Sequence, residues 1–170
     1  VSQFSGDIQS DTLAPYIHLK GFYPAGRLDK NSEGLLVLTN DGKLQNQITD
    51  PKFKLCKTYL VQVENEISSY AIQALRDGIC LNDGMTKPAI VNRIDGPTNL
   101  WDRDPPIRKR KFITTSWIKI TIYEGKNRQI RRMTAAAGFP TLRLIRIAIG
   151  DWCLDNLLPG QFLRREVAYI

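Results

Sequence analysis

The chain has 170 residues, which is enough for one domain with a hydrophobic core and too few for two domains of ordinary size. Lysine and arginine number 24 against 17 aspartates and glutamates, so the formal charge of +7 favours a polyanionic partner, nucleic acid or an anionic membrane surface. No apolar run approaches the roughly eighteen residues that a transmembrane helix needs.

The cysteines and the histidine indicate no structural cross-link. Cys56, Cys80 and Cys153 are odd in number and far apart, which is untypical of a disulfide framework and fits a reducing compartment, so we expect a cytoplasmic protein. His18 is the single histidine and no Cys-x-x-Cys pair is present, so the usual structural zinc spacings are absent. We expect His18 to be structural or exposed, and we expect no metal.

In chain order, residues 12–19 predict a short helix or a turn. Residues 34–40 (GLLVLTN) are a short apolar run that ends at Asn-Asp-Gly, which predicts a buried strand and a turn. Residues 42–49 have helical spacing and stop at Asp-Pro, whereas 57–64 (KTYLVQVE) alternate between apolar and polar and predict a strand.

Residues 68–78 predict a helix, since a serine stands at the N-cap position and a glycine follows the last turn. Residues 85–94 predict a strand. Residues 95–111 predict a proline-rich loop whose basic end, PPIRKRK, is a candidate RNA contact or simply a solvated loop. Residues 115–125 alternate strictly and predict a strand.

Residues 127–139 predict a helix closed by a glycine, 142–150 an alternating strand, and 160–167 a last short strand. Strands therefore outnumber helices, and no strand–helix–strand repeat is visible. The fold class that follows is α+β, with a mixed or largely antiparallel sheet and flanking helices.

Searches for common catalytic motifs leave few candidates. No Gly-x-Gly-x-x-Gly follows a predicted strand, no phosphate loop surrounds a Gly-Lys pair, and no Gly-x-Ser-x-Gly elbow is present. An enzyme of this sequence is expected to work without a metal or an organic cofactor, so its chemistry would rest on carboxylates, arginines and tyrosines.

The first candidate is Asp29, in the turn Gly-Arg-Leu-Asp before the apolar run. Glu33 lies four residues further on and could complete a carboxylate pair for acid–base chemistry. The alternative is that Asp29, Asn31 and Ser32 only cap a turn. The second candidate is Tyr59, whose ring would project from a strand and could stack on an unpaired base, or else is a half-buried strand tyrosine.

The third candidate is the basic helix 127–139. Ile130, Met133 and Ala137 form one apolar stripe on a helical wheel, with Arg128 and Arg132 opposite. The exposed pair suits phosphate contacts, although a solvated basic face is the alternative. Arg131 lies on the flank of the stripe, where a partly desolvated arginine favours a carboxylate partner.

Four segments in this order resemble the RNA pseudouridine synthases, specifically the RsuA/RluB/RluE/RluF family. They are GRLDKNSEGLLVLTNDG (26–42), KTYLVQV (57–63), EGKNRQIRRM (124–133) and GFPTLRLIRIAIGDWCLDNLLPGQFLRREV (138–167). They cover well over half of the chain, and the first is highly specific. The stretches NDGMTKPA, PPIRKRKFITTSW and RRMTAAAGFPTLRLIR are most similar to the member that lacks a separate N-terminal S4 RNA-binding domain and acts on large-subunit ribosomal RNA.

The resemblance implies a pseudouridine synthase catalytic domain with a central cleft, and isomerisation of uridine in RNA to pseudouridine without a cofactor. It implies that Asp29 is the catalytic aspartate, that Tyr59 stacks on the target base and that Arg131 pairs with the aspartate. The residues expected to bind substrate or RNA are Arg27, Lys57, Lys126, Arg128, Arg132 and, along LRLIRI, Leu144 or Ile145.

On this interpretation residues 1–170 are one catalytic domain without an S4 domain, expected to act as a monomer on ribosomal RNA and away from membranes. The family's catalytic domains usually begin with a strand and an NKP-type segment, which we expect to be missing before VSQF. Two alternatives stay open. One is a non-catalytic RNA-binding or ribosome-assembly module of the same fold, and the other is a glycosidase or nuclease that uses Asp29 and Glu33.

Overall fold

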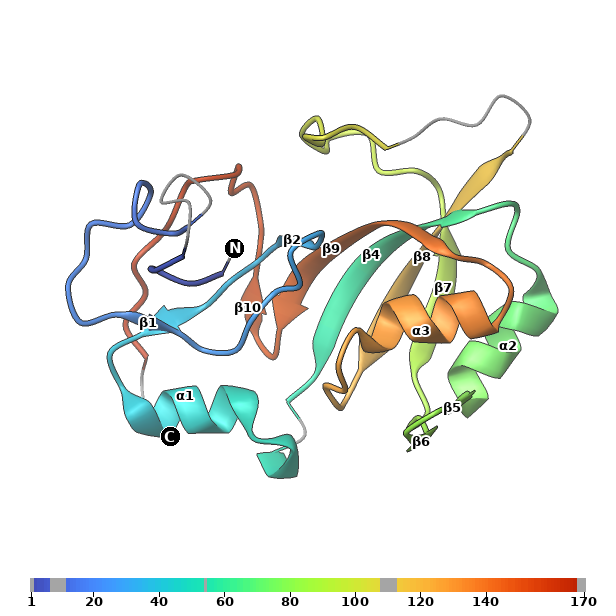
Figure 1. Cartoon of the computed structure of the whole chain (residues 1–170), viewed down its shortest axis with the longest axis horizontal. Coiled ribbons are helices and arrows are strands. Elements are labelled where there is room, and N and C mark those ends of the chain that lie inside the picture. Colours follow the sequence, from blue (N-terminus) through green and yellow to red (C-terminus); the bar gives the residue numbers. More distant parts are fainter. Residues whose placement is uncertain (1, 7–11, 54, 108–112, 168–170) are drawn as a thin grey trace.

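The computed structural model describes residues 2–6, 12–53, 55–107 and 113–167, and a six-stranded sheet forms its main body (Figure 1). Five strands follow the order β10-β9-β4-β8-β7 with antiparallel neighbours, and β2 pairs in parallel with β9. Their bounds are β2 (Glu33–Gly34), β4 (Lys57–Glu64), β7 (Ile90–Ile94), β8 (Thr115–Ile122), β9 (Thr141–Ile149) and β10 (Trp152–Cys153). The α+β prediction with a mixed, largely antiparallel sheet is confirmed.

Two helices cover one face of this sheet, α2 (Ser69–Asp77) and α3 (Gln129–Ala136) (Figure 1). The alternation in the sequence produces the packing, because every second side chain of β4 and β8 faces the helices. Val61, Ile118 and Ile120 are fully buried there, together with Leu75 of α2 and Met133 of α3. Burial of this apolar surface is the main stabilising term of the domain.

A smaller layer lies beside the sheet and contains α1 (Gly42–Thr49) and the two-stranded pair of β1 (Tyr23–Pro24) and β3 (Leu38–Thr39). Its own core consists of Ala25, Leu35, Leu44, Ile48 and Ile149. A short 3₁₀ turn, η2 (Pro51–Phe53), follows α1, and a small hairpin of β5 (Cys80–Leu81) and β6 (Gly84–Met85) follows α2. The loop that carries Asp29 connects β1 to β2 and so joins the two layers.

The helices predicted at 42–49 and 68–78 are confirmed as α1 and α2, and each begins at a side-chain cap. The Asp41 carboxylate accepts from the backbone N–H groups of Lys43 and Leu44 at the start of α1. The Ser68 hydroxyl accepts from the N–H of Ala71 at the start of α2, and Gly78 follows its last turn. A side-chain oxygen at this position satisfies an N–H group that has no partner within the helix.

Three strand predictions need correction. Residues 34–40 are not one strand, because Gly34 pairs with β9 and Leu38 with β1, so the segment passes between two sheets. Residues 85–94 are split between β6 and β7, and 160–167 form no strand and are exposed. Residues 12–19 form a turn, and the stretch 95–107 is a loop as predicted. The basic residues 108–111 lie outside the described part of the chain.

His18 is exposed, and Cys56, Cys80 and Cys153 are free thiols. Among the described residues, no helix has the length and apolar composition needed to cross a bilayer. No group of three or more metal-ligating side chains occurs within the same residues.

Candidate active site

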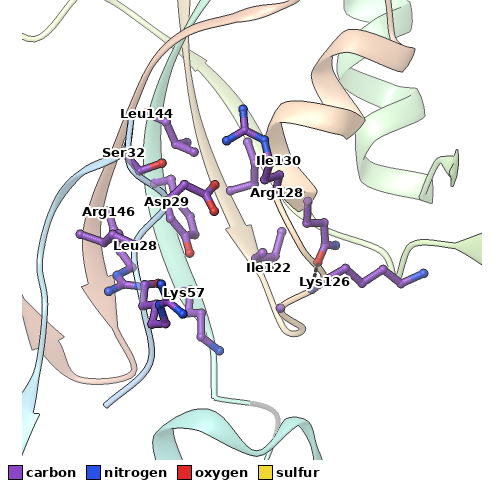
Figure 2. A pocket seen from close by; sticks show the side chains of 14 residues that line it. Leu28, Asp29, Ser32, Lys57, Ile122, Lys126, Arg128, Ile130, Leu144 and Arg146 are labelled. Atoms are coloured by element: carbon purple, nitrogen blue, oxygen red, sulfur yellow. Dashed lines mark hydrogen bonds between the residues drawn. The ribbon is translucent and has the colours of Figure 1, made fainter. Parts of the chain in front are cut away.

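A cavity of about 130 Å³ opens between the Asp29 loop, β4, β9 and the turn that leads into α3 (Figure 2). It lies beside the first residues of β4 and the last residues of β8, which are neighbours because the two strands are antiparallel. The lining residues are Arg27, Leu28, Asp29, Ser32, Lys57, Tyr59, Ile122, Gly125, Lys126, Arg128, Gln129, Ile130, Leu144 and Arg146.

Asp29 is the single carboxylate among these lining residues, and Figure 2 shows its side chain directed into the cavity. The Ser32 N–H donates to the Asp29 carbonyl at 2.9 Å and closes a tight turn. Within the described chain the carboxylate itself takes part in no hydrogen bond or ion pair, so it does not cap the turn with its side chain. A carboxylate that is left accessible in this way is available for chemistry.

Gly34 allows this loop to lie directly on β9. It has φ +100°, and a Cβ at this position would overlap the backbone carbonyl of Arg146. The adjacent Leu35 N–H donates to that same carbonyl at 2.7 Å. Only glycine adopts this conformation at low energy while allowing so close an approach. The contact of Gly34 with β9, a few residues after Asp29, therefore holds the Asp29 loop against the sheet.

Arg131 does not form the expected ion pair with Asp29. Its Nη2 donates instead to the carbonyl of Asn31 at 2.6 Å, within the same turn, and its Nε is buried without a partner. Burial lowers the pKa of the Arg131 guanidinium and the nearby Arg128 lowers it further, while the Asp29 charge acts in the opposite direction. The Arg131 side chain extends from the flank of α3 and binds the backbone of the turn rather than the Asp29 carboxylate.

Tyr59 lines the cavity and is 9% exposed. Burial raises the pKa of its hydroxyl, and the neighbouring Arg146 guanidinium lowers it, although no hydrogen bond of good geometry joins the two groups. Tyr59 faces the cavity because it shares the face of β4 occupied by Val61 and Val63. Its assignment as a base-stacking residue stays a prediction.

Four cations predicted to bind RNA line the cavity, namely Arg27, Lys57, Lys126 and Arg128. Arg128 adopts a left-handed conformation, φ 46° and ψ 36°, as the N-cap residue of α3, and Figure 2 shows it across the cavity from Lys57. Lys57 begins β4, and its Nζ donates to the Leu55 carbonyl at 3.3 Å. Burial lowers the pKa of the Lys57 ammonium group, and the nearby charge of Arg146 lowers it further.

Two of the predicted RNA ligands, Lys126 and Arg132, are occupied by Asp83 in the β5–β6 hairpin. Arg132 donates from Nη1 and Nη2 to the two Asp83 carboxylate oxygens at 2.8 and 3.1 Å. The Lys126 Nζ donates to the Asp83 and Gly84 carbonyls at 3.0 and 3.3 Å, and in Figure 2 this side chain points away from the cavity. These bonds tie the hairpin to the start of α3. Arg132 is therefore not the free phosphate ligand that the helical wheel indicates.

The register of β9 distinguishes between the two aliphatic candidates. Leu144 lines the cavity, whereas Ile145 is fully buried and is not among the lining residues. Arg146, two positions after Leu144, also lines the cavity and was missed by the sequence reasoning. The period of two along a strand was the signal that could have found it, once Leu144 had been chosen.

Glu33 lies outside the cavity and is fully engaged. Its carboxylate accepts from Nε and Nη2 of Arg143 at 3.0 and 2.9 Å and from Nε1 of Trp101 at 2.8 Å. Arg103 completes the cluster at 3.4 Å. Glu33 anchors the loop after β7 to the edge of the sheet, so the structure does not support the alternative of a catalytic Asp29–Glu33 pair.

Sequence comparisons with known proteins all find the same enzyme family. Residues 9–136 match the family described as RNA pseudouridylate synthase. The ribosomal large subunit pseudouridine synthase E of Xanthomonas axonopodis pv. citri is 56% identical over 161 residues, which are 94% of this chain and 85% of that protein. The protein of the same name from Vibrio parahaemolyticus is 55% identical over 162 residues, 95% of this chain and 68% of that protein.

Solved structures show the same fold. A structure described as a pseudouridylate synthase superposes with a TM-score of 0.73 at 31% identity, over 88% of this chain and 60% of the other. A chain of an archaeal box H/ACA Nop10–Cbf5 complex matches with a TM-score of 0.52 at 14% identity, over 84% of this chain and 43% of that one, and this shows the fold alone.

Proposed function

This chain belongs to the RNA pseudouridine synthase family, and from that premise we propose that it isomerises a uridine of large-subunit ribosomal RNA to pseudouridine. The observation that carries the proposal is one unpaired carboxylate, Asp29, in a small cavity beside a tyrosine ring and several cations. The relatives named above supply the class of RNA, since their names specify the large ribosomal subunit.

The enzyme reaches the target uridine only after its base has left the stack. Unstacking costs a few kcal/mol of free energy, which new contacts have to offset. Tyr59 supplies a replacement aromatic surface, and stacking of a base on such a ring contributes about 1–3 kcal/mol. Leu144 and Ile130 give the cavity apolar walls, while the basic residues around its mouth suit the phosphates of the strand.

Asp29 then acts in its ionised form. It either attacks C1′ of the ribose as a nucleophile or removes the C2′ proton to give a glycal. Both routes break the bond between N1 and C1′, after which the uracil rotates and bonds to C1′ through C5. The C5 proton leaves, N1 gains a proton, and the substrate and product have the same composition. No cofactor is therefore needed to balance the reaction.

Two arginines lie near Asp29. Arg128 lies across the cavity, and the guanidinium of Arg131 is close enough for the Asp29 charge to affect its pKa. In our proposal Arg131 acts through the turn, because its bond to the Asn31 carbonyl fixes the backbone next to Asp29.

We further propose that residues 1–170 form a single catalytic domain that acts as a monomer in the cytoplasm. The continuous sheet from β10 to β7 supports one domain, since β9 contributes residues to both parts of the core. Sedimentation of the purified chain would measure the monomer directly, and a concentration-dependent shift to a larger species would contradict it.

The decisive experiment measures tritium release from uridine labelled at C5 in unmodified large-subunit ribosomal RNA. We expect release by the wild-type chain and none by Asp29→Ala. Glu66→Ala is the matched control, because Glu66 is an exposed carboxylate that follows the opposite end of β4 and pairs with Arg93. Release that survives the loss of Asp29 would refute the mechanism. RNA binding by both proteins without any release would favour the non-catalytic module.

A further inference from the structure

Arg146 is a buried cation that forms no ion pair with any of the described residues. The residue is 4% exposed and lines the cavity. Its Nε donates to the Leu35 carbonyl at 2.8 Å and its Nη1 to the Arg27 carbonyl at 3.5 Å, on either side of Asp29 in sequence. Neither acceptor carries a net charge. Its Nη2 is buried and has no hydrogen-bond partner within the described chain.

An unpaired buried donor on a charged group is costly. Leaving such a group without a partner destabilises a protein by about 1–3 kcal/mol, and by more when the group is charged. The two carbonyl bonds account for Nε and Nη1 and tether the Asp29 loop, but they leave Nη2 without an acceptor in a residue that lines the cavity. A purely structural arginine would not require this last donor to remain free. The arrangement therefore calls for a ligand oxygen.

A second cation stands beside it. Lys57 lines the same cavity, and its charge and that of Arg146 are close enough for the arginine to depress the pKa of the lysine. The Lys57 Nζ has one weak bond, to the Leu55 carbonyl at 3.3 Å. Figure 2 shows Arg146 and Lys57 on one side of Asp29 and Arg128 on the other. Two neighbouring cations without a carboxylate between them raise the free energy of the empty site.

The charge balance decides between the possible ligand oxygens. A carbonyl of the base could accept from Nη2, but it would leave two like charges uncompensated. A phosphate accepts from the guanidinium and brings a negative charge to the two cations, and arginine binds phosphate oxygens with paired N–H groups. We propose that Arg146 and Lys57 form the subsite that binds a phosphate adjoining the target uridine. This inference rests on the proposed function, because it takes the occupant to be the nucleotide held at Asp29.

The position also fits the reaction. The ribose lies between the phosphate and the base in any nucleotide, and Arg146, Asp29 and Tyr59 all line this one small cavity. A nucleotide that is held by its phosphate at Arg146 and by its base at Tyr59 therefore presents its sugar to the carboxylate. Positioning of this kind accounts for a large part of the rate gain in enzymes that use few catalytic groups.

The test is a binding experiment that does not depend on isomerisation. Uridine and its 5′- and 3′-monophosphates are titrated into the full chain, and the NMR signals of the arginine side-chain N–H groups are followed at millimolar ligand. We expect one monophosphate to bind about tenfold more tightly than uridine, as one charge-assisted contact provides. We expect Arg146→Met to abolish that advantage, and Arg146→Lys to retain part of it.

Two further variants guard against a folding defect. Lys57→Met removes the second cation and is expected to reduce the same advantage. Arg143→Met is the matched control, since Arg143 is a comparably buried guanidinium on the same strand that binds Glu33 outside the cavity. It should lower stability and leave the preference for the monophosphate intact.

The inference is overturned if the wild-type chain shows no phosphate preference, or if Arg146→Met keeps it. Equal weakening of uridine and monophosphate in Arg146→Met would also overturn it, in favour of a contact to the base or a role limited to the loop. A phosphate preference that depends on Arg146, in a protein that releases no tritium from RNA, would support the subsite and refute the proposed function.

Discussion

Replacement of Glu33 by glutamine tests whether this second acidic residue is structural or catalytic. Glu33 is four residues from Asp29 but faces the Arg143–Trp101 cluster, so we expect Glu33→Gln to lower stability while the folded fraction keeps its activity. A mechanism with two carboxylates predicts the opposite, a stable and inactive protein.

The magnitude follows from the contacts. The side chains of Glu33 and Arg143 are 18% and 9% exposed, so the pair is largely shielded from water. Breaking a buried ion pair by removing one partner costs about 3–5 kcal/mol. Glutamine keeps one acceptor oxygen, so we expect a loss of about 2–4 kcal/mol in the free energy of unfolding. A domain with about 5–15 kcal/mol of stability remains mostly folded after such a change.

The assay is urea unfolding of wild-type and variant chains, combined with tritium release per folded molecule. Glu66→Gln serves as the control, because Glu66 and its partner Arg93 are 52% and 53% exposed and their pair contributes about 1 kcal/mol or less. Loss of activity in a folded Glu33→Gln protein would refute the structural role. A change in unfolding free energy as small as that of the control would refute the packing argument.

Three other changes test the structure at separate points. Gly34→Ala should destabilise the chain by about 3 kcal/mol or more, because φ is +100° and the paired strand leaves no room for a Cβ. Gly42→Ala, at the start of α1, is the control and should be neutral or slightly stabilising in the same urea assay. Burial raises the pKa of the Tyr59 hydroxyl. The stability that this hydroxyl contributes should therefore fall as the pH rises above about 10, its pKa in the unfolded chain. Tyr59→Phe should lessen this alkaline loss of stability in thermal melts. Asp83→Asn should free Arg132 and make the salt dependence of RNA binding steeper, and an unchanged slope would contradict a latent phosphate contact there.

Local patterns in the sequence determined the main elements. Alternation indicated which faces of β4 and β8 are buried, and the serine cap marked where α2 begins. These features depend on residues within a few positions of one another, so they can be recognised without the tertiary structure. The apolar stripe of Ile130 and Met133 was confirmed for the same reason.

Pairings between distant segments could not be predicted in this way. The residues 34–40 look like one strand because they are continuously apolar, yet the sheet partner changes partway along them. Residues 160–167 have strand-like composition but no neighbouring strand to pair with in the described chain. Composition describes what a segment tolerates, while hydrogen bonding to another strand decides whether it becomes part of a sheet.

For the site, local sequence patterns predicted that Asp29 stands in a turn and that Tyr59 projects from a strand. Only the tertiary structure decided which partner each cation meets. Arg131 reaches a carbonyl 100 residues away, Arg143 binds a carboxylate 110 residues away, and Arg146 a carbonyl 111 residues away. The sequence shows that these side chains carry charge, but the burial and the contacts that decide what each charge does exist only after the chain has folded.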